Sequence, residues 1–184
     1  MNSKDKKTVI GFVGLPGSGK STAISAVSDL GHVVTMGDVL RDELRKRGEK
    51  INPSSLGSLA KELRKKHGKD VVARKCIELI KDMNENVILV DGLRSMYEVE
   101  LFKEEWKFPI ISIECENDKR YKNLLARQRS DDSTDITLIK QRDKRELSFG
   151  IQDVISQSDY KIKNNSDIDK LRQKTLQVVR KIIG

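Results

Sequence analysis

Residues 14–21, which read GLPGSGKS, constrain the fold of this chain more than any other segment. They match the pattern G-x-x-x-x-G-K-[S/T], whose glycines permit a tight loop and whose lysine and hydroxyl suit a bound polyphosphate and its metal ion. An apolar, β-branched segment at residues 8–13 precedes the loop, and a segment with helical spacing at residues 21–30 follows it and stops at Gly31. A strand, this loop and a helix in that order are typical of proteins that hold the phosphates of a nucleoside triphosphate.

Each residue type in the loop has a role in holding such an anion. We expect the three glycines to adopt positive φ and to bring backbone N–H groups onto phosphate oxygens. Lys20 is expected to contact the β- and γ-phosphates, and the Ser21 hydroxyl is expected to bind Mg²⁺. The loop residues predicted to bind ATP are Gly14, Leu15, Pro16, Gly17, Ser18, Gly19, Lys20 and Ser21.

Length and composition indicate one domain. The chain has 184 residues, enough for one sizeable core and too few for two independent ones, so residues 1–184 are predicted to form a single domain. The start of the chain is polar and lysine-rich, and no segment approaches the length of a membrane span. Cys76 and Cys115 lie far apart in apolar segments, which predicts reduced core cysteines and a cytoplasmic location.

The net charge permits two kinds of partner. The chain carries 36 basic and 28 acidic residues, a formal charge of +8, which suits either an anionic small substrate or a nucleic acid. The basic stretches at residues 41–50 and 61–69 also contain acidic residues, and no aromatic side chains are interleaved with them for base stacking. We therefore expect most of this charge to lie on solvated helix faces, and a nucleic acid partner is not favoured.

Strands and helices alternate along the rest of the chain. Further strands are predicted at residues 32–35, 87–92, 110–115 and 160–163. Helices are predicted from an N-cap at Asp38 toward Gly48, then at residues 56–68, 72–80, 121–125, 136–147 and 167–183. This alternation predicts an α/β fold, a doubly wound, five-stranded parallel sheet with flanking helices.

Two segments outside the loop are expected to complete a site. The helices within residues 37–81 exceed what a crossover needs, so this segment is predicted to cover an acceptor. Residues 127–146 are predicted to form a lid, because Arg127 and Arg129 precede a polar turn and Arg142 and Arg145 follow it. Arginines carried by a lid stabilise the charge of a phosphoryl group in transfer. The alternative is a pair of amphipathic helices joined by surface ion pairs.

Asp91 ends the buried strand predicted at residues 87–92. The carboxyl end of a parallel strand opens onto the ligand crevice, where a carboxylate can hold water in the shell of Mg²⁺. Asp91 and Ser21 are therefore the predicted metal residues.

Several of these motifs resemble those of known kinases. The loop followed by MGDVLR at residues 36–41 resembles adenylate kinases, in which the loop is followed by TGDMLR. This resemblance implies that Arg41 binds the acceptor nucleoside monophosphate, although Met36 stands where that family has threonine. DGLR at residues 91–94 is similar to D-G-F-P-R, which implies an acceptor role for Arg94. RSDD at residues 129–132, followed by Arg142, is similar to the lid pattern of nucleoside monophosphate kinases.

The C-terminal part is similar to a different group. SDYKIKNN at residues 158–165 is similar to the A-D-Y-x-I-x-N ending of dephospho-coenzyme A kinases, which implies that Asn164 lies near the adenine of ATP. Over nearly its whole length the chain resembles an uncharacterised archaeal P-loop family described as adenylate-kinase-related or dephospho-coenzyme-A-kinase-like. The resemblance implies ATP binding and leaves the acceptor open.

The leading hypothesis is a phosphotransferase that moves the γ-phosphoryl group of Mg-ATP to a nucleotide-like acceptor, with a nucleoside monophosphate slightly ahead. The alternative acceptor is a ribose hydroxyl, as in dephospho-coenzyme A. A phosphate acceptor needs positioning, whereas a hydroxyl acceptor needs a base, for which Asp38 is the candidate. The predicted catalytic residues are Lys20, Asp38, Arg129 and Arg142. Two alternatives are a P-loop ATPase that regulates an RNA or protein partner, and a module that binds ATP without turnover.

Overall fold

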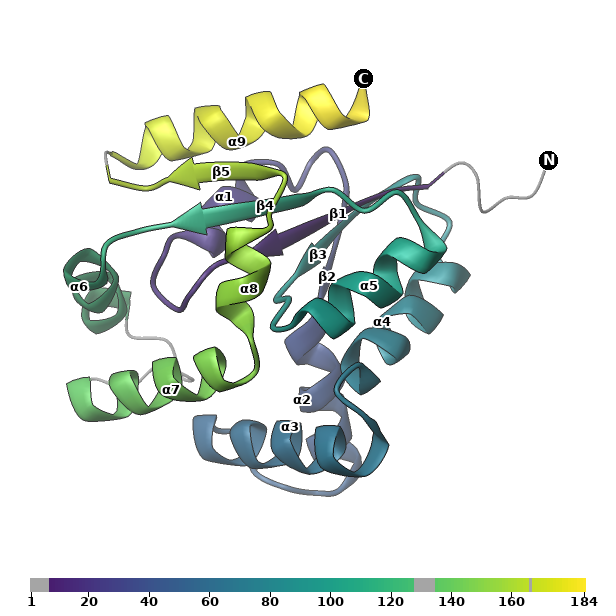
Figure 1. Ribbon diagram of the computed structural model, residues 1–184, viewed down its shortest axis with the longest axis vertical. Coiled ribbons are helices and arrows are strands. Elements are labelled where there is room, and N and C mark those ends of the chain that lie inside the picture. The colour runs from purple at the N-terminus through teal and green to yellow at the C-terminus, as the bar shows by residue number, and fades with distance from the viewer. Residues whose placement is uncertain (1–6, 128–134, 166) are drawn as a thin grey trace.

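The computed structural model describes residues 7–127, 135–165 and 167–184. Five parallel strands form one sheet in the order β2-β3-β1-β4-β5 (Figure 1). The three inner strands are β1 (Thr8–Val13), β3 (Val87–Asp91) and β4 (Ile110–Glu114), and the edge strands are β2 (His32–Thr35) and β5 (Tyr160–Lys163). The inner strands are the most apolar because helices cover them on both faces. The predicted five-stranded, doubly wound sheet is confirmed.

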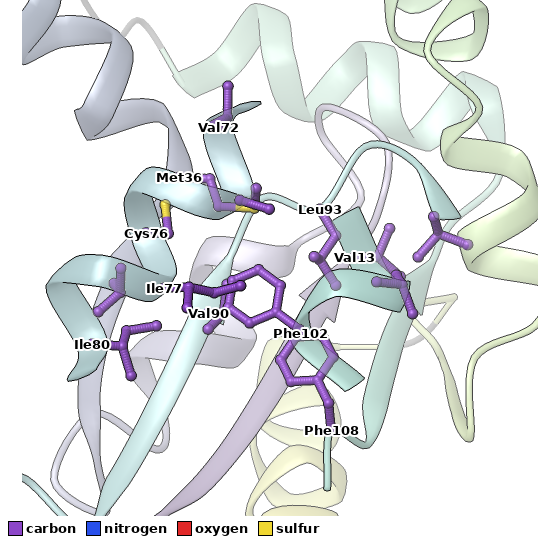
Figure 2. Packing of buried hydrophobic residues seen from close by; sticks show 14 of the residues in the cluster. Val13, Met36, Val72, Cys76, Ile77, Ile80, Val90, Leu93, Phe102 and Phe108 are labelled. Atoms are coloured by element: carbon purple, nitrogen blue, oxygen red, sulfur yellow. The ribbon is translucent and has the colours of Figure 1, made fainter. Parts of the chain in front are cut away.

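Two hydrophobic clusters lie on the two faces of the sheet. Val9 and Val13 of β1 face α4 (Val71–Asp82), α5 (Met96–Glu105) and α8 (Ile151–Ser156), whereas Ile10 and Phe12 face α1 (Lys20–Ser25) and α9 (Ile168–Ile183). Figure 2 shows part of the first cluster, in which the rings of Phe102 and Phe108 stack with centroids 4.6 Å apart. The alternation of β1 side chains thus joins both layers to the strand that leads into the phosphate loop.

The other helices of the described residues lie toward the carboxyl ends of the strands (Figure 1). They are α2 (Met36–Lys46), α3 (Pro53–His67), α6 (Asn117–Arg127) and α7 (Ile136–Ser148). Helix α2 continues directly from β2, and α3 begins with an Asn52 capping box, in which the Asn52 side chain accepts hydrogen bonds from the backbone N–H groups of Ser54 and Ser55. In the described part of the chain, no helix is long and apolar enough to cross a bilayer.

Several predicted elements differ from those observed. The first helix ends at Ser25 rather than near Leu30, and the Ser28 hydroxyl donates to the Ser25 carbonyl at 3.0 Å, a local bond that competes with helix continuation. Asp38 is not an N-cap, because α2 begins at Met36 and Asp38 lies in its first turn. Cys115 is only half-buried, so the expectation of a core residue is wrong for it, whereas Cys76 is buried.

Helix α5 is absent from the sequence prediction. Its apolar face is interrupted by Glu98, which is fully buried although it is charged in water. A buried glutamate does not follow from periodicity, since carboxylates are almost never buried without a partner. The partner of Glu98 is Arg64, which lies 34 residues away in the sequence.

Candidate functional site

The phosphate loop joins the end of β1 to the start of α1, and its glycines serve two different purposes. Gly17 and Gly19 have φ of +79° and +99°, as expected. Gly14 is not among the positive-φ glycines, so that expectation is wrong for it. A Cβ on Gly14 would instead lie 2.6 Å from the Ser18 Oγ and 2.7 Å from the Ile113 carbonyl oxygen, so close packing requires glycine there.

Three side chains from distant segments hold the loop by its carbonyl oxygens. The Asn164 side chain donates to the Ser18 carbonyl at 2.8 Å, and the Asn123 side chain donates to the Gly17 carbonyl at 2.9 Å. The Arg120 guanidinium donates to the Pro16 carbonyl at 2.6 Å. These bonds fix the peptide planes of the loop, which is the condition for its N–H groups to form an anion nest. Asn164 therefore contacts the loop itself.

Arg120 is a residue that sequence reasoning did not identify. Its side chain is 2% exposed, lies on α6 and also donates to both carboxylate oxygens of Asp143 on α7, at 3.2 and 2.5 Å. It thereby joins the loop, α6 and α7 around one buried guanidinium. In the sequence it is one of many basic residues on a helix, and only its tertiary contacts distinguish it.

Lys20 and Asp91 form an ion pair at the carboxyl end of the sheet. Strand β3 pairs with β1 so that Asp91 lies opposite Phe12, which brings this carboxylate to the base of the loop. Burial lowers the pKa of Lys20, and the neighbouring Asp91 carboxylate partly offsets that effect. The Asp91 carboxylate therefore balances the charge of a largely buried ammonium group.

A hollow of about 760 Å³, here called the loop hollow, opens over residues 14–22. Ser21 and Asp91 both line it, as do Asp38 and Asn164. Among the described residues, no three or more histidine, cysteine or acidic side chains are grouped so that they could hold a metal ion. One hydroxyl and one carboxylate suit Mg²⁺ that keeps most of its ligands as water and phosphate oxygens, so the residues present fit the expected ion.

A second hollow of about 110 Å³, here called the arginine hollow, lies between α2, α3 and α7. Five arginines line it together with apolar side chains and one acid, Glu146. They are Arg41, Arg64, Arg94, Arg142 and Arg145.

The two hollows share part of their lining, namely Gly37, Arg41, Gly92, Arg94 and Arg142. The structure therefore brings together three of the arginines predicted from the sequence. Arg94 is also ion-paired with Glu146, which ties the end of β3 to α7.

The other predicted residues have different positions. Asp38 pairs with Arg41 at 2.7 Å and lines the loop hollow but not the arginine hollow. Arg129 and the polar turn at residues 130–133 lie outside the residues that the structure describes. Of the predicted lid, α7 is therefore the described part.

Arg64, which lines the arginine hollow, and its buried partner Glu98 were not predicted from the sequence. Arg64 of α3 donates to the buried Glu98 carboxylate at 2.8 Å, and Glu98 also accepts from the Arg94 backbone N–H at 2.7 Å. Burial raises the pKa of Glu98, and the adjacent Arg64 guanidinium opposes that shift. This explains the acidic residue in the apolar face of α5: it holds Arg64 and the backbone after β3.

Comparison with known proteins adds the family. Residues 13–140 match the model of the AAA domain family AAA_17. The chain is 43% identical over 176 residues to the UPF0200 protein of Methanothermobacter thermautotrophicus, an alignment that covers 95% of this chain and 90% of the relative. The chain belongs to the UPF0200 family. A UPF0200/UPF0201 protein of Archaeoglobus fulgidus is 40% identical over 179 residues, and there the chain spans 55% of the relative's length.

Solved structures place the UPF0200 chain in a fold group. TT1252 from Thermus thermophilus superposes with a TM-score of 0.62 at 17% identity, covering 97% of this chain and 99% of the other. Shikimate kinase from Acinetobacter baumannii, in complex with shikimate, gives a TM-score of 0.58 at 18% identity, covering 96% and 95%. At these identities the likeness shows the fold alone: the chain is a P-loop NTPase with a nucleotide-kinase-like fold, and its P-loop domain implies nucleotide binding. The finer resemblance to dephospho-coenzyme A kinases stays a prediction.

Proposed function

We propose that this protein transfers the γ-phosphoryl group of Mg-ATP to a nucleotide-like acceptor, with a nucleoside monophosphate as the first candidate. One observation carries the proposal: the loop hollow and the arginine hollow meet at Arg41, Arg94 and Arg142. A triphosphate seated on the loop would end near this junction. Guanidinium groups there can neutralise both the transferred phosphoryl group and an acceptor phosphate, because they stay charged and bind phosphate oxygens in pairs.

In the proposed transfer, no protein side chain needs to form a covalent bond to the phosphoryl group. An oxygen of the acceptor phosphate forms a bond to the γ-phosphorus, and the bond from that phosphorus to the bridging oxygen breaks and leaves ADP. Lys20 would exchange its contact with Asp91 for phosphate oxygens, which would leave Asp91 available to the metal shell. Mg²⁺ held near Ser21 and Asp91 would neutralise charge on the β- and γ-phosphates.

The position of Asp38 supports a phosphate acceptor over a hydroxyl acceptor. A hydroxyl must lose a proton, so a base should lie beside it. Asp38 is the candidate from the sequence, but it is paired with Arg41 and does not line the arginine hollow. An acceptor phosphate is already anionic and needs no base, which fits a hollow lined by five arginines and one glutamate.

The test is a transfer assay with purified protein, ATP and Mg²⁺ against the four common nucleoside monophosphates and dephospho-coenzyme A, with products separated by chromatography. We expect a nucleoside diphosphate in at least one lane. Slow ADP release in every lane, with no phosphorylated acceptor, would overturn the proposal. Transfer to dephospho-coenzyme A alone would replace it with a hydroxyl kinase.

Two variants separate the donor and acceptor roles. Lys20→Met should lose ATP binding, because it removes the charge that the loop brings to the phosphates. Arg142→Gln should lower turnover at saturating substrate by tenfold or more, a size typical of one lost contact to the migrating charge. Arg172→Gln is the matched control, since Arg172 is an exposed α9 residue paired with Asp169. Unchanged turnover in Arg142→Gln would remove this arginine from the reaction.

A further inference from the structure

We infer that Arg64 and Arg145 recognise the base of the acceptor and favour a base with keto oxygens on its edge, guanine or uracil, over adenine. This inference rests on the proposed function. It starts from a difference among the five arginines: three line both hollows, whereas Arg64 and Arg145 line the arginine hollow alone. If the three shared arginines bind the acceptor phosphate, the base at the other end of the acceptor would lie beside Arg64 and Arg145.

Arg64 is held in one orientation by its surroundings. Its side chain is 11% exposed, and its guanidinium lies over the Phe149 ring, 4.4 Å from the centroid. One edge donates to Glu98, which is 0% exposed. The Arg64 Nε is buried and has no hydrogen-bond partner among the described residues. A buried donor without a partner is costly, and an oxygen supplied by a ligand would reduce that cost.

Arg145 of α7 is positioned by a close contact with α3. Its guanidinium packs against Gly57 in the second turn of α3, where a Cβ would lie 2.8 Å from the Arg145 Nη1 and 2.9 Å from its Cζ. Glycine within a helix destabilises it relative to alanine, and Gly57 does not have the positive φ that would explain its presence. Close approach of the guanidinium to the helix backbone is the reason that the structure offers.

The polar groups around the base would therefore be hydrogen-bond donors. The acid that lines the arginine hollow, Glu146, is engaged by Arg94. Guanine presents O6 and N7 as acceptors, and uracil presents O4, so either can accept from arginine. Adenine shares the N7 acceptor but carries a 6-amino group, a donor, in place of the keto oxygen, and that donor would face other donors. Leu56, Ala60 and Phe149 supply apolar surface for the faces of the ring.

The experiment measures kcat/KM for GMP, UMP and AMP with saturating Mg-ATP. We expect GMP or UMP to exceed AMP by about tenfold or more, the discrimination typical of one good arginine–base contact. AMP equal to or better than both would overturn the inference while leaving the proposed function intact.

Variants test whether these two arginines carry the preference. Arg145→Met removes the donors and keeps the length of the side chain, and Arg64→Lys keeps a positive charge beside the buried Glu98, so that folding is preserved. Each should lower the ratio of GMP or UMP to AMP by roughly 5- to 100-fold, mainly through KM. The exposed Arg172→Met serves as the control and should leave the ratio unchanged. An equal loss for all three monophosphates in both variants would mean general positioning and would overturn the inference.

A binding measurement separates this inference from the proposed function. Thermal unfolding is followed with ADP and each monophosphate, without transfer. Selective protection by GMP or UMP, together with no transfer to any monophosphate, would overturn the phosphotransferase proposal and support base recognition by this site. Transfer that prefers AMP, together with the strongest protection by AMP, would do the reverse.

Discussion

Replacing Gly57 with alanine should stabilise the chain and weaken acceptor binding at the same time. Gly57 lies in the second turn of α3, a 15-residue helix, and its φ is not positive, so alanine fits the backbone. The new Cβ would lie 2.8 Å from the Arg145 Nη1, whereas ordinary contact begins at 3.4 Å, so the guanidinium must retreat by about half an ångström. Because it is the end of a flexible side chain, it moves and the helix does not.

The two effects have different sizes. Alanine in place of glycine within a helix adds about 1 kcal/mol to the free energy of unfolding, from which the displacement of Arg145 subtracts a part. For a chain of this length, 1 kcal/mol corresponds to roughly 2–4 °C in the melting temperature. Loss of one charged hydrogen bond to the acceptor costs about 1.5–3 kcal/mol, which raises the KM for the acceptor by roughly tenfold or more.

Differential scanning calorimetry gives the first quantity, and steady-state kinetics with the acceptor found in the transfer screen gives the second, with the KM for ATP as an internal control. A double-mutant cycle with Arg145→Ala provides the decisive comparison. In that background Gly57→Ala should still stabilise the chain but should no longer affect the KM. A melting temperature that falls by several degrees, or an unchanged KM for the acceptor, would refute the argument that glycine is there to admit the guanidinium.

Three further predictions concern buried groups. Arg120→Leu should lower the free energy of unfolding, measured by urea denaturation, by about 3–5 kcal/mol, because it leaves the Asp143 carboxylate buried without its ion pair. Adding Asp143→Asn should recover part of this loss, and no recovery would contradict the pairing. Burial lowers the pKa of Lys20 below its ordinary value of 10.5, so in the alkaline range below 10.5 the unfolded chain binds more protons than the folded one. The contribution of Lys20 to the free energy of unfolding should therefore rise with pH in that range. A Lys20→Met variant with the same slope of stability against pH would count against this prediction. Burial raises the pKa of Cys76 to about 12, so its thiol should resist alkylation at pH 8 until the chain unfolds, as followed by mass spectrometry, and rapid labelling of the folded chain would argue otherwise.

Local patterns predicted the fold well because they repeat a simple physical rule. Strands such as residues 87–91 are buried on both faces and are therefore continuously apolar, and an amphipathic helix such as residues 168–183 shows its period directly. The prediction was wrong where side chains compete with the backbone, as in the early end of α1 beside Ser28. It missed α5 because Glu98 interrupts the pattern, and the Arg64 partner that satisfies this carboxylate is 34 residues away.

The same reasoning explains which site residues could be found. Arg41 and Arg94 stand beside recognisable motifs, so their sequence neighbours marked them. Arg64 and Arg120 lie in helices rich in basic residues, and there they look like solvated charge. Their burial depends on contacts with other helices and loops, which the local sequence pattern does not indicate.

By itself, the sequence determined that this chain has a phosphate loop between a strand and a helix, because glycine, lysine and serine at residues 14–21 meet backbone and charge requirements that are satisfied within a few residues. It also determined the alternation of elements, and with it the parallel sheet. Only the tertiary structure decided that five arginines of the described residues, from three helices and one loop, surround a single hollow, and that Glu98 and Gly57 hold two of them there. The physical reason is that these positions depend on packing between segments that are distant in the chain. One residue satisfies the charge of another or leaves space for it, and the sequence around either residue does not indicate this.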